Sequence, residues 1–325
     1  MKKILDFIFL VLFLVLTSCV SGLHNTESLY LDVVPYDGNE IDVKKYISIV
    51  DTFVLCVDDK VISYKVTDAC MDDSTVFILD DQKNIMSFDL KSGVMKSVIN
   101  KVGHGHGEYS QPISICVSKD VLYVLDYGGK MLKYDKKLKF MNSIRLDFSA
   151  MDFIKVKDGF FFYNLFPNEN IKSVVSTDEY GTVKKSYSYT QNTKMPDIML
   201  TSKLFTRTDA GIYVTNITYD TLYEFRDGEF VPVVQISDEN SDNKDCKLYR
   251  CFPLKNSIIT FYESKKHIIG NIYDKKTGKS MSGKFKSPIN YPIFPSFERN
   301  GTLYGLYPQP TDVNKYILVK YRLNN

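Results

Sequence analysis

The sequence of 325 residues contains no tryptophan, only 4 histidines and no surplus of either charge. Its 41 Lys and Arg residues are balanced by 39 Asp and Glu residues, which gives a formal net charge of +2. This balance excludes a nucleic-acid-binding protein that relies on bulk positive charge. The sequence also has no GxSxG, HExxH, P-loop or kinase motif, so it carries no signature of the common hydrolases, metalloproteases or nucleotide-dependent enzymes.

Cysteines are few, and they do not form a metal-binding pattern. Six are present, and no CxxC or Cys–His spacing predicts a zinc site. One of them, Cys19, has a separate role argued below, and the odd number that remains leaves at least one thiol unpaired. Cys246 and Cys251 lie in a polar segment where they could form a disulfide, and the sequence leaves this pairing open. We therefore expect neither a disulfide scaffold nor a cofactor.

The N-terminus predicts an export signal. Lys2 and Lys3 precede an apolar run from Ile4 to Leu16, interrupted once by Asp6. At 1.5 Å per residue a helix of this length covers about 20 Å, which is too short for a bilayer core of about 30 Å. The run is therefore typical of a signal peptide and not of a membrane-spanning helix.

The signal peptide ends at a cysteine. The Leu-Thr-Ser-Cys sequence at 16–19 resembles the bacterial lipobox, whose cysteine is lipidated and becomes the new N-terminus. We predict a lipoprotein signal peptide at 1–18, a lipid on Cys19 and a polar tether at 19–28. Several acyl chains on one residue would anchor the protein stably to a membrane of the bacterial cell envelope. The tether lacks an acidic run that would suggest surface export, so the periplasmic side of the outer membrane is favoured over the cell surface.

The rest of the chain, residues 29–325, contains a repeat of about 45 residues. Segments 70–80 and 116–126 align without gaps at an offset of 46, and each is followed by a second strand, ending at Asp89 and Asp135. Four weaker copies end near residues 164, 216, 262 and 307. The copies are rich in β-branched and aromatic residues, with Gly and Asp in the turns between them. A unit of this length with four short strands is a propeller blade, so the sequence predicts an all-β, single six-bladed β-propeller.

The sixth copy is too short to complete its own blade. Its segment 316–322 corresponds to the third strand of a blade, and the sequence ends at Asn325. A ring left open at this point would expose two sheet edges. We predict that an N-terminal strand, Leu29–Val34, forms the outer strand of the last blade and closes the ring.

A glycine-rich segment between the first two copies carries a family resemblance. Gly103, Gly105, Gly107, Glu108 and Tyr109 form a Gly-x-Gly-x-Gly-Glu-Tyr stretch. With the strands that follow it, this stretch resembles the six-bladed β-propeller lipoproteins of Bacteroidetes, which are similar to NHL-repeat propellers. That family usually has Arg or Lys at the first intervening position and Pro at the second, where this sequence has histidine. The resemblance implies the fold and the location, and it implies no activity.

Long connections are predicted on one face of the ring, and we place a ligand site there. They span residues 99–112, 164–173, 187–203, 237–250 and 307–315. Long loops on a rigid scaffold commonly carry recognition. The candidate residues on this face are Asp80, His104, His106, Glu108, Tyr109, Asp126, Asn164 and Asn216.

Each of these candidates also has a purely structural interpretation. Asp80, Asp126, Asn164 and Asn216 end the second strand of their blades, where such side chains commonly bond to backbone groups of a turn. His104 and His106 alternate along the chain and could share a metal with Glu108, but a flexible glycine loop with incidental side chains is the favoured interpretation, and no metal is predicted. A further repeat position carries residues that we expect to pack in the core: Cys70, Cys116, Ile154, Thr206, Phe252 and Phe297.

These observations favour a non-enzymatic function. We predict a membrane-anchored propeller that binds a partner protein or an extracytoplasmic ligand such as a glycan or a peptide. The alternative is a carbohydrate-active propeller enzyme, a glycan lyase or hydrolase. Its acid and base would come from different blades, where sequence spacing cannot reveal them.

Overall fold

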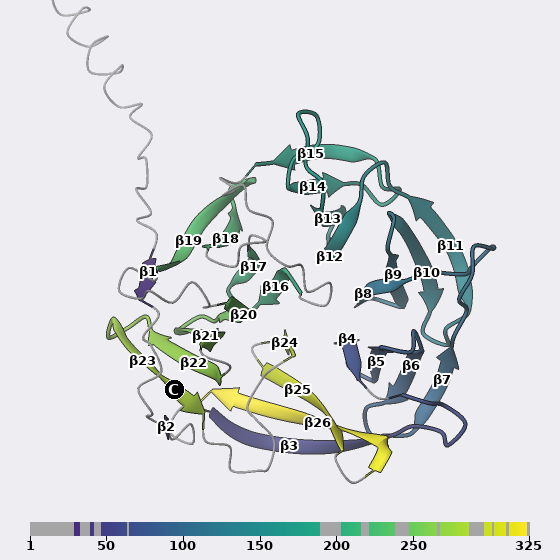
Figure 1. The fold of residues 1–325 in the computed structure, drawn as a ribbon, viewed down its shortest axis with the longest axis horizontal. Helices are drawn as coiled ribbons and strands as arrows, with labels where there is room; N and C mark the ends of the chain where they lie inside the picture. Colours follow the sequence, from purple (N-terminus) through teal and green to yellow (C-terminus); the bar gives the residue numbers. More distant parts are fainter. Residues whose placement is uncertain are drawn as a thin grey trace, which may run out of the picture.

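Six sheets, each with four antiparallel strands, are arranged in a ring, and two of the sheets carry a further parallel strand at the edge (Figure 1). This computed structural model describes residues 29–32, 40–41, 47–63, 65–188, 203–215, 221–237, 247–264, 267–285, 296–300, 302–309 and 312–323. Within these ranges every regular element is a strand, and no helix of the length and hydropathy needed to cross a bilayer occurs. The six-bladed β-propeller predicted from the sequence is confirmed.

Each blade has its first strand at the channel and its fourth at the outside. The blades begin, in chain order, at β4, β8, β12, β16, β20 and β24. The first three blades are formed by β4 (Val66–Met71), β5 (Thr75–Asp80), β6 (Ile85–Asp89) and β7 (Met95–Ile99); β8 (Pro112–Ser118), β9 (Val121–Asp126), β10 (Lys130–Asp135) and β11 (Phe140–Arg145); β12 (Ala150–Val156), β13 (Gly159–Asn164), β14 (Val174–Thr177) and β15 (Val183–Tyr187).

The remaining three blades repeat this order, and each of them includes one strand from the N-terminal part of the chain. They are formed by β16 (Phe205–Thr208), β17 (Gly211–Thr215), β18 (Thr221–Arg226) and β19 (Glu229–Ser237) with β1 (Leu29–Asp32); β20 (Lys247–Pro253), β21 (Ser257–Ser264), β22 (His267–Asp274) and β23 (Lys279–Phe285) with β2 (Glu40–Ile41); β24 (Phe297–Arg299), β25 (Thr302–Gln309) and β26 (Asp312–Leu323) with β3 (Ile47–Cys56).

Strand β5 shows why the second strand of a blade can be a continuous apolar run in the sequence. All six of its residues are buried, although a strand places successive side chains on opposite faces. Val76 and Ile78 pack into the cluster between blades six and one, whereas Phe77 and Leu79 pack into the cluster between blades one and two. Both faces of a blade are covered by its neighbours, so the alternation divides the residues between two cores.

The ring is closed by β3 and not by the segment that we predicted. Strand β3 pairs antiparallel with β26 from Ile47↔Leu323 to Cys56↔Lys315 and is the outer strand of blade six. Strand β1, which lies within the predicted closing segment Leu29–Val34, instead pairs parallel with β19 at the edge of blade four. An N-terminal strand therefore closes the last blade, but its assignment to Leu29–Val34 was wrong.

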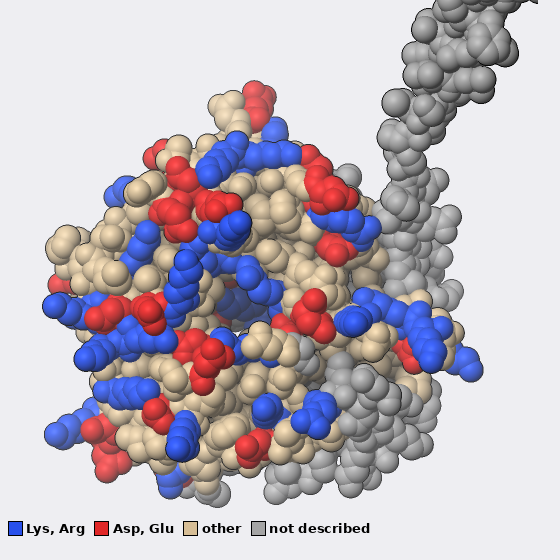
Figure 2. All heavy atoms as spheres, turned by 180° about the vertical axis from the view of Figure 1, so that it is seen from behind, with Lys and Arg blue, Asp and Glu red and all other residues tan. Residues whose placement is uncertain are grey.

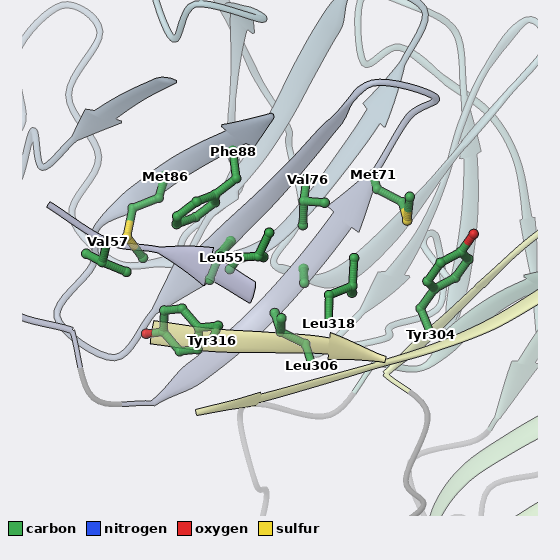
Figure 3. Close-up of a cluster of buried hydrophobic side chains, with 12 residues drawn as sticks. Leu55, Val57, Met71, Val76, Met86, Phe88, Tyr304, Leu306, Tyr316 and Leu318 are labelled. Carbon is green, nitrogen blue, oxygen red and sulfur yellow. The ribbon is translucent and has the colours of Figure 1, made fainter. Parts of the chain in front are cut away.

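Length and packing explain this outcome. Strand β26 has 12 residues, β1 has 4 and β3 has 10, so only β3 is long enough to cover it. Strand β3 also lies directly before blade one in the chain, and its Leu55 is fully buried between Val76 and Phe88 of blade one and Leu318 of blade six (Figure 3).

Blade one is fastened to this closing strand by a tight turn. The amide of Cys56 donates a 2.9 Å hydrogen bond to the carbonyl of Gly93, in the turn between β6 and β7. Gly93 has φ +72°, and a Cβ atom there would lie 1.9 Å from the carbonyl oxygen of Val54. Only glycine fits this close approach.

Candidate functional site

A cavity of about 390 Å³ occupies the centre of the ring. Figure 2 shows a hollow at this centre on one face, with Lys and Arg side chains gathered around it. Its wall includes the repeat position singled out in the sequence, which belongs to the innermost strand of every blade: Cys70, Cys116, Ile154, Thr206, Phe252 and Phe297. We expected this position to pack in the core, and several of its members do contact core clusters. The structure adds that the same residues face the channel.

The cavity opens on the face that carries the short turns. Its lining continues to the C-terminal ends of the innermost strands, at Ser118, Thr208 and Arg299, and into the turns at Asp209 and Asn300. These turns join the first strand of a blade to the second. The mouth therefore lies on the face opposite the one on which we predicted the ligand site.

Further along the channel, a buried cluster of polar side chains surrounds Lys203. Its Nζ lies 2.8 Å from Asp68 Oδ2 and 3.7 Å from Asp152 Oδ1. Lys203 also donates to Ser114 Oγ at 2.9 Å and to the Ile115 carbonyl at 3.1 Å. Because these residues come from the innermost strands of blades one to three and from the start of blade four, one lysine joins four blades.

Both carboxylates of the Lys203 cluster have further partners. Asp68 Oδ2 accepts from the amide of Ile115 at 2.7 Å. Asp152 Oδ2 accepts from the amides of Leu204 and Phe205 at 2.8 and 2.9 Å, and its Oδ1 accepts from Ser114 Oγ at 2.8 Å. Buried charges are tolerated when they are paired and hydrogen-bonded in this way.

The pKa directions follow from this arrangement. Burial raises the pKa of Asp68, and Lys203 acts in the opposite direction. Burial alone would lower the pKa of Lys203, but Asp68 and Asp152 outweigh it and raise the pKa well above its ordinary value. Asp68 and Asp152 therefore stabilise the charged form of Lys203, and both carboxylates are engaged in this contact.

Three cationic side chains near the mouth have defined partners, and two of them bridge neighbouring blades. Lys155 Nζ pairs with Glu179 of its own blade at 2.6 Å. Arg299 donates to the Met71 carbonyl at 2.6 Å and to Asp73 Oδ1 at 2.5 Å. Arg207 donates to the carbonyl of Lys155, a partner that brings no compensating charge.

The predicted candidates Asp80, Asp126 and Asn164 lie at the other end of the blades. Asp80 accepts from the amide and the Nδ2 of Asn84 at 2.7 and 2.8 Å. Asp126 accepts from the amides of Ser110 and Gln111 at 3.0 and 2.6 Å, and Asn164 donates to three carbonyls of its own loop. Each holds its own loop, and the structure does not bring the three into one cluster. Asn216 lies outside the described residues.

The glycine-rich loop is organised around Tyr109. This side chain is fully buried; its hydroxyl donates to the carbonyls of Lys83 and Ile99 at 2.9 and 3.2 Å and accepts from the amide of Lys101 at 3.1 Å. The loop thus fastens blade two to blade one.

The other candidates of this loop lie nearer its surface. Glu108 Oε2 accepts from the Gly105 amide at 2.8 Å, and a Cβ atom at Gly103 would lie 2.1 Å from that oxygen. His104 and His106 are exposed, and the His106 ring meets Phe140 edge-on at 4.8 Å. In the described part of the chain, no three His, Cys, Asp or Glu residues are grouped to hold a metal ion.

Cys19 and Cys246 lie outside the part of the chain that the structure describes, so the predicted lipidation of Cys19 and the predicted choice between a paired and an unpaired Cys246 stay predictions.

Our sequence analysis missed the Lys203 cluster, although a signal was present. Two residues before the repeat position that faces the channel, the strands carry Asp68, Ser114, Asp152 and Arg250. Polar residues that recur at one place in otherwise apolar strands indicate a shared polar layer.

Together, the ring of six sheets and the central cavity define the chain as a six-bladed β-propeller with a ligand-sized hollow on its axis. The chain belongs to the family described as a domain of unknown function, DUF4934, whose model matches residues 33–321. No protein of curated function shows significant sequence similarity to it.

Two solved structures share the fold. A protein of Bacteroides fragilis that carries the description of an exported protein aligns with a TM-score of 0.70 at 16% identity, over 91% of this chain and 100% of that one. A member of the DUF4221 family from Bacteroides vulgatus aligns with a TM-score of 0.57 at 12% identity, over 86% of this chain and 99% of that one. At these identities the likeness concerns the fold alone.

Proposed function

We propose that this protein is an exported, lipid-anchored propeller that binds a ligand in its central cavity and does not transform it. The cavity is the observation that carries the proposal, because its volume of about 390 Å³ lies in the range of small-molecule sites. The lipobox before Cys19 supports the anchor. The fold it shares with a Bacteroides fragilis protein described as exported supports a place in the cell envelope.

The carboxylates near the channel favour binding over glycan cleavage. Glycosidases need two carboxyl groups about 5–10 Å apart, one on each side of the scissile bond. Asp68 and Asp152 are buried and held by Lys203 and backbone amides. Among the described lining residues, Asp209 and Glu298 are the only carboxylates, so most of the wall is apolar or cationic.

A cavity-blocking variant tests the binding function. Thr206→Trp places a large side chain in the cavity that Thr206 lines. Tyr180→Trp, the matched control, introduces the same side chain at an exposed turn. With a panel of short peptides and of neutral and acidic oligosaccharides, we expect at least one compound to raise the melting temperature of the unmodified protein and of Tyr180→Trp. It should leave that of Thr206→Trp unchanged. Product formation from any panel compound would support the enzyme alternative instead.

The anchor is tested separately. We expect Cys19→Ala to abolish incorporation of an alkyne-labelled fatty acid and to move the protein from the membrane fraction to the soluble fraction. Cys56→Ala, which replaces an exposed cysteine of strand β3, should keep both the label and the membrane association. Equal labelling of the two variants would overturn the assignment of Cys19.

A further inference from the structure

We propose that the central cavity selects a small organic anion, a molecule with an apolar body and a carboxylate, sulfate or phosphate group held at the mouth. This rests on the proposed function in so far as the cavity is taken to be the binding site, and it adds the chemical class of the ligand.

The first argument is the charge of the wall. The cavity is lined by five cationic side chains, Lys155, Lys203, Arg207, Arg250 and Arg299, and by two carboxylates, Asp209 and Glu298. In Figure 2, Lys and Arg side chains lie in and around the hollow, and some Asp and Glu side chains lie on its rim. A concave surface lined mainly by one sign of charge concentrates its field on a ligand of the opposite sign.

The second argument concerns which of these charges remain available. Lys203 and Lys155 are paired with carboxylates behind the wall. Arg299 is paired with Asp73, but the Asp73 side chain is 90% exposed, so water screens that pair. Arg207 is itself exposed, and its bond goes to a carbonyl. Arg250 lies further along the channel, where it donates to the carbonyl of Lys203 at 3.1 Å. The guanidinium groups placed to meet a ligand at the mouth are therefore Arg207 and Arg299, with the carboxylates Asp209 and Glu298 next to them in the chain.

These two guanidinium groups are each held at the mouth by a neighbouring blade. Arg207 belongs to β16 of blade four and Arg299 to β24 of blade six, and these two strands approach one another at the channel. Their contacts with the backbone of neighbouring blades reduce the freedom of both side chains. Fixed guanidinium groups bind carboxylate, sulfate and phosphate through paired N–H donors.

The third argument is the apolar wall beneath them. Cys70, Cys116, Ile154, Phe252 and Phe297 face the cavity, and burial raises the pKa of both cysteine thiols, so they remain neutral. The Lys203 cluster joins the strands further along the channel. The cavity thus offers an apolar interior beneath a cationic mouth, which is complementary to an amphipathic anion.

The two cavity thiols provide a direct test of this field. We expect the anionic sulfonatoethyl methanethiosulfonate to modify Cys70 and Cys116 faster than the cationic trimethylammonioethyl reagent, about tenfold after division by the same ratio at exposed Cys56. Mass spectrometry of the digested full-length protein resolves each site. The higher thiol pKa slows both reagents equally, because both attack the same thiolate.

Substitutions at the mouth identify the source of the selectivity. In the double variant Arg207→Gln/Arg299→Gln the normalised ratio should fall to near 1, whereas Arg207→Lys/Arg299→Lys should retain most of it. The ratio at Cys56 and the melting temperature report that the variants are folded. A normalised ratio of 1 or less in the unmodified protein would overturn the inference.

A ligand test separates this inference from the proposed function. Phenylacetate, phenyl sulfate and phenyl phosphate are compared with uncharged phenylacetamide for protection of Cys116 against N-ethylmaleimide. Protection by at least one anion at concentrations where the amide gives none supports the inference. Equal protection by the amide would overturn the anion preference but leave a ligand-binding cavity. If none of the four compounds protected Cys116 and the normalised ratio of the two methanethiosulfonate reagents were near 1, both the anion preference and the ligand-binding function of the cavity would be overturned.

Discussion

A chain that starts at residue 57 is expected to lose cooperative folding, whereas a chain that starts at residue 47 should fold. The shorter chain lacks β3, so the edge of β26 is unpaired over the whole ladder from Ile47↔Leu323 to Cys56↔Lys315. It also loses Leu55 from the cluster between blades six and one, where a fully buried leucine contributes about 2–3 kcal/mol. A ring depends on every contact between blades, and total stabilities of such domains are only about 5–15 kcal/mol.

The chain that starts at residue 47 is the matched control, because it lacks β1 and β2 but keeps β3. Thermal unfolding followed by circular dichroism measures both. The longer chain should show one cooperative transition, and the shorter one should show a broad transition or none. If both chains unfolded with the same midpoint, β3 would not be the strand that closes the ring.

The second large effect is expected at Lys203. Lys203→Met removes the cation and leaves Asp68 and Asp152 buried without their partner, and breaking a buried ion pair in this way costs about 3–5 kcal/mol. The free energy of unfolding in urea measures the loss. Lys185→Met is the control, since its pair with Glu229 is largely exposed and screened by water, so its loss should change the free energy of unfolding little.

The Lys203→Met variant should also respond to pH with a defined sign. Burial already raises the pKa of Asp68 above its unfolded value, and loss of the lysine raises it further. Between the Asp68 pKa of the unfolded chain and that of the folded protein, the native state binds more protons than the unfolded chain. The free energy of unfolding of the variant therefore rises as the pH falls from the folded pKa towards the unfolded pKa. The destabilisation should thus be smaller at pH 5 than at pH 8. Adding Asp68→Asn should recover part of the loss, and a penalty that grew on acidification would contradict this explanation.

The repeat made the fold predictable from the sequence. Both faces of each blade are buried against similar neighbours, so each blade needs the same short apolar strands and the same turns at nearly the same spacing. The third strands β6 and β10 accordingly end at the predicted residues Asp89 and Asp135. The shortness of the sixth copy likewise predicted closure by an N-terminal strand.

The features that depend on contacts between distant blades were harder to predict. Leu29–Val34 and Ile47–Cys56 both have the composition of a strand, and they are distinguished by the length of the partner strand β26 and by the packing of Leu55 against blade one. Lys203 meets Asp68 and Asp152 across separations of more than 50 residues, with no local spacing to connect them. The Gly-x-Gly-x-Gly-Glu-Tyr stretch drew attention as a possible site, but the hydrogen bonds of Tyr109 go to the backbone of the neighbouring blade.

The parallel strands β1 and β2 have a mechanical consequence. If the chain is held at its N-terminus, a pull along it reaches the β1–β19 ladder first and the β2–β23 ladder next, before it reaches β3. A pull along a strand shears its ladder, so the hydrogen bonds share the load instead of opening one after another. Under such a load the two short ladders on blades four and five would bear the force before β3, the strand on which the closure of the ring depends.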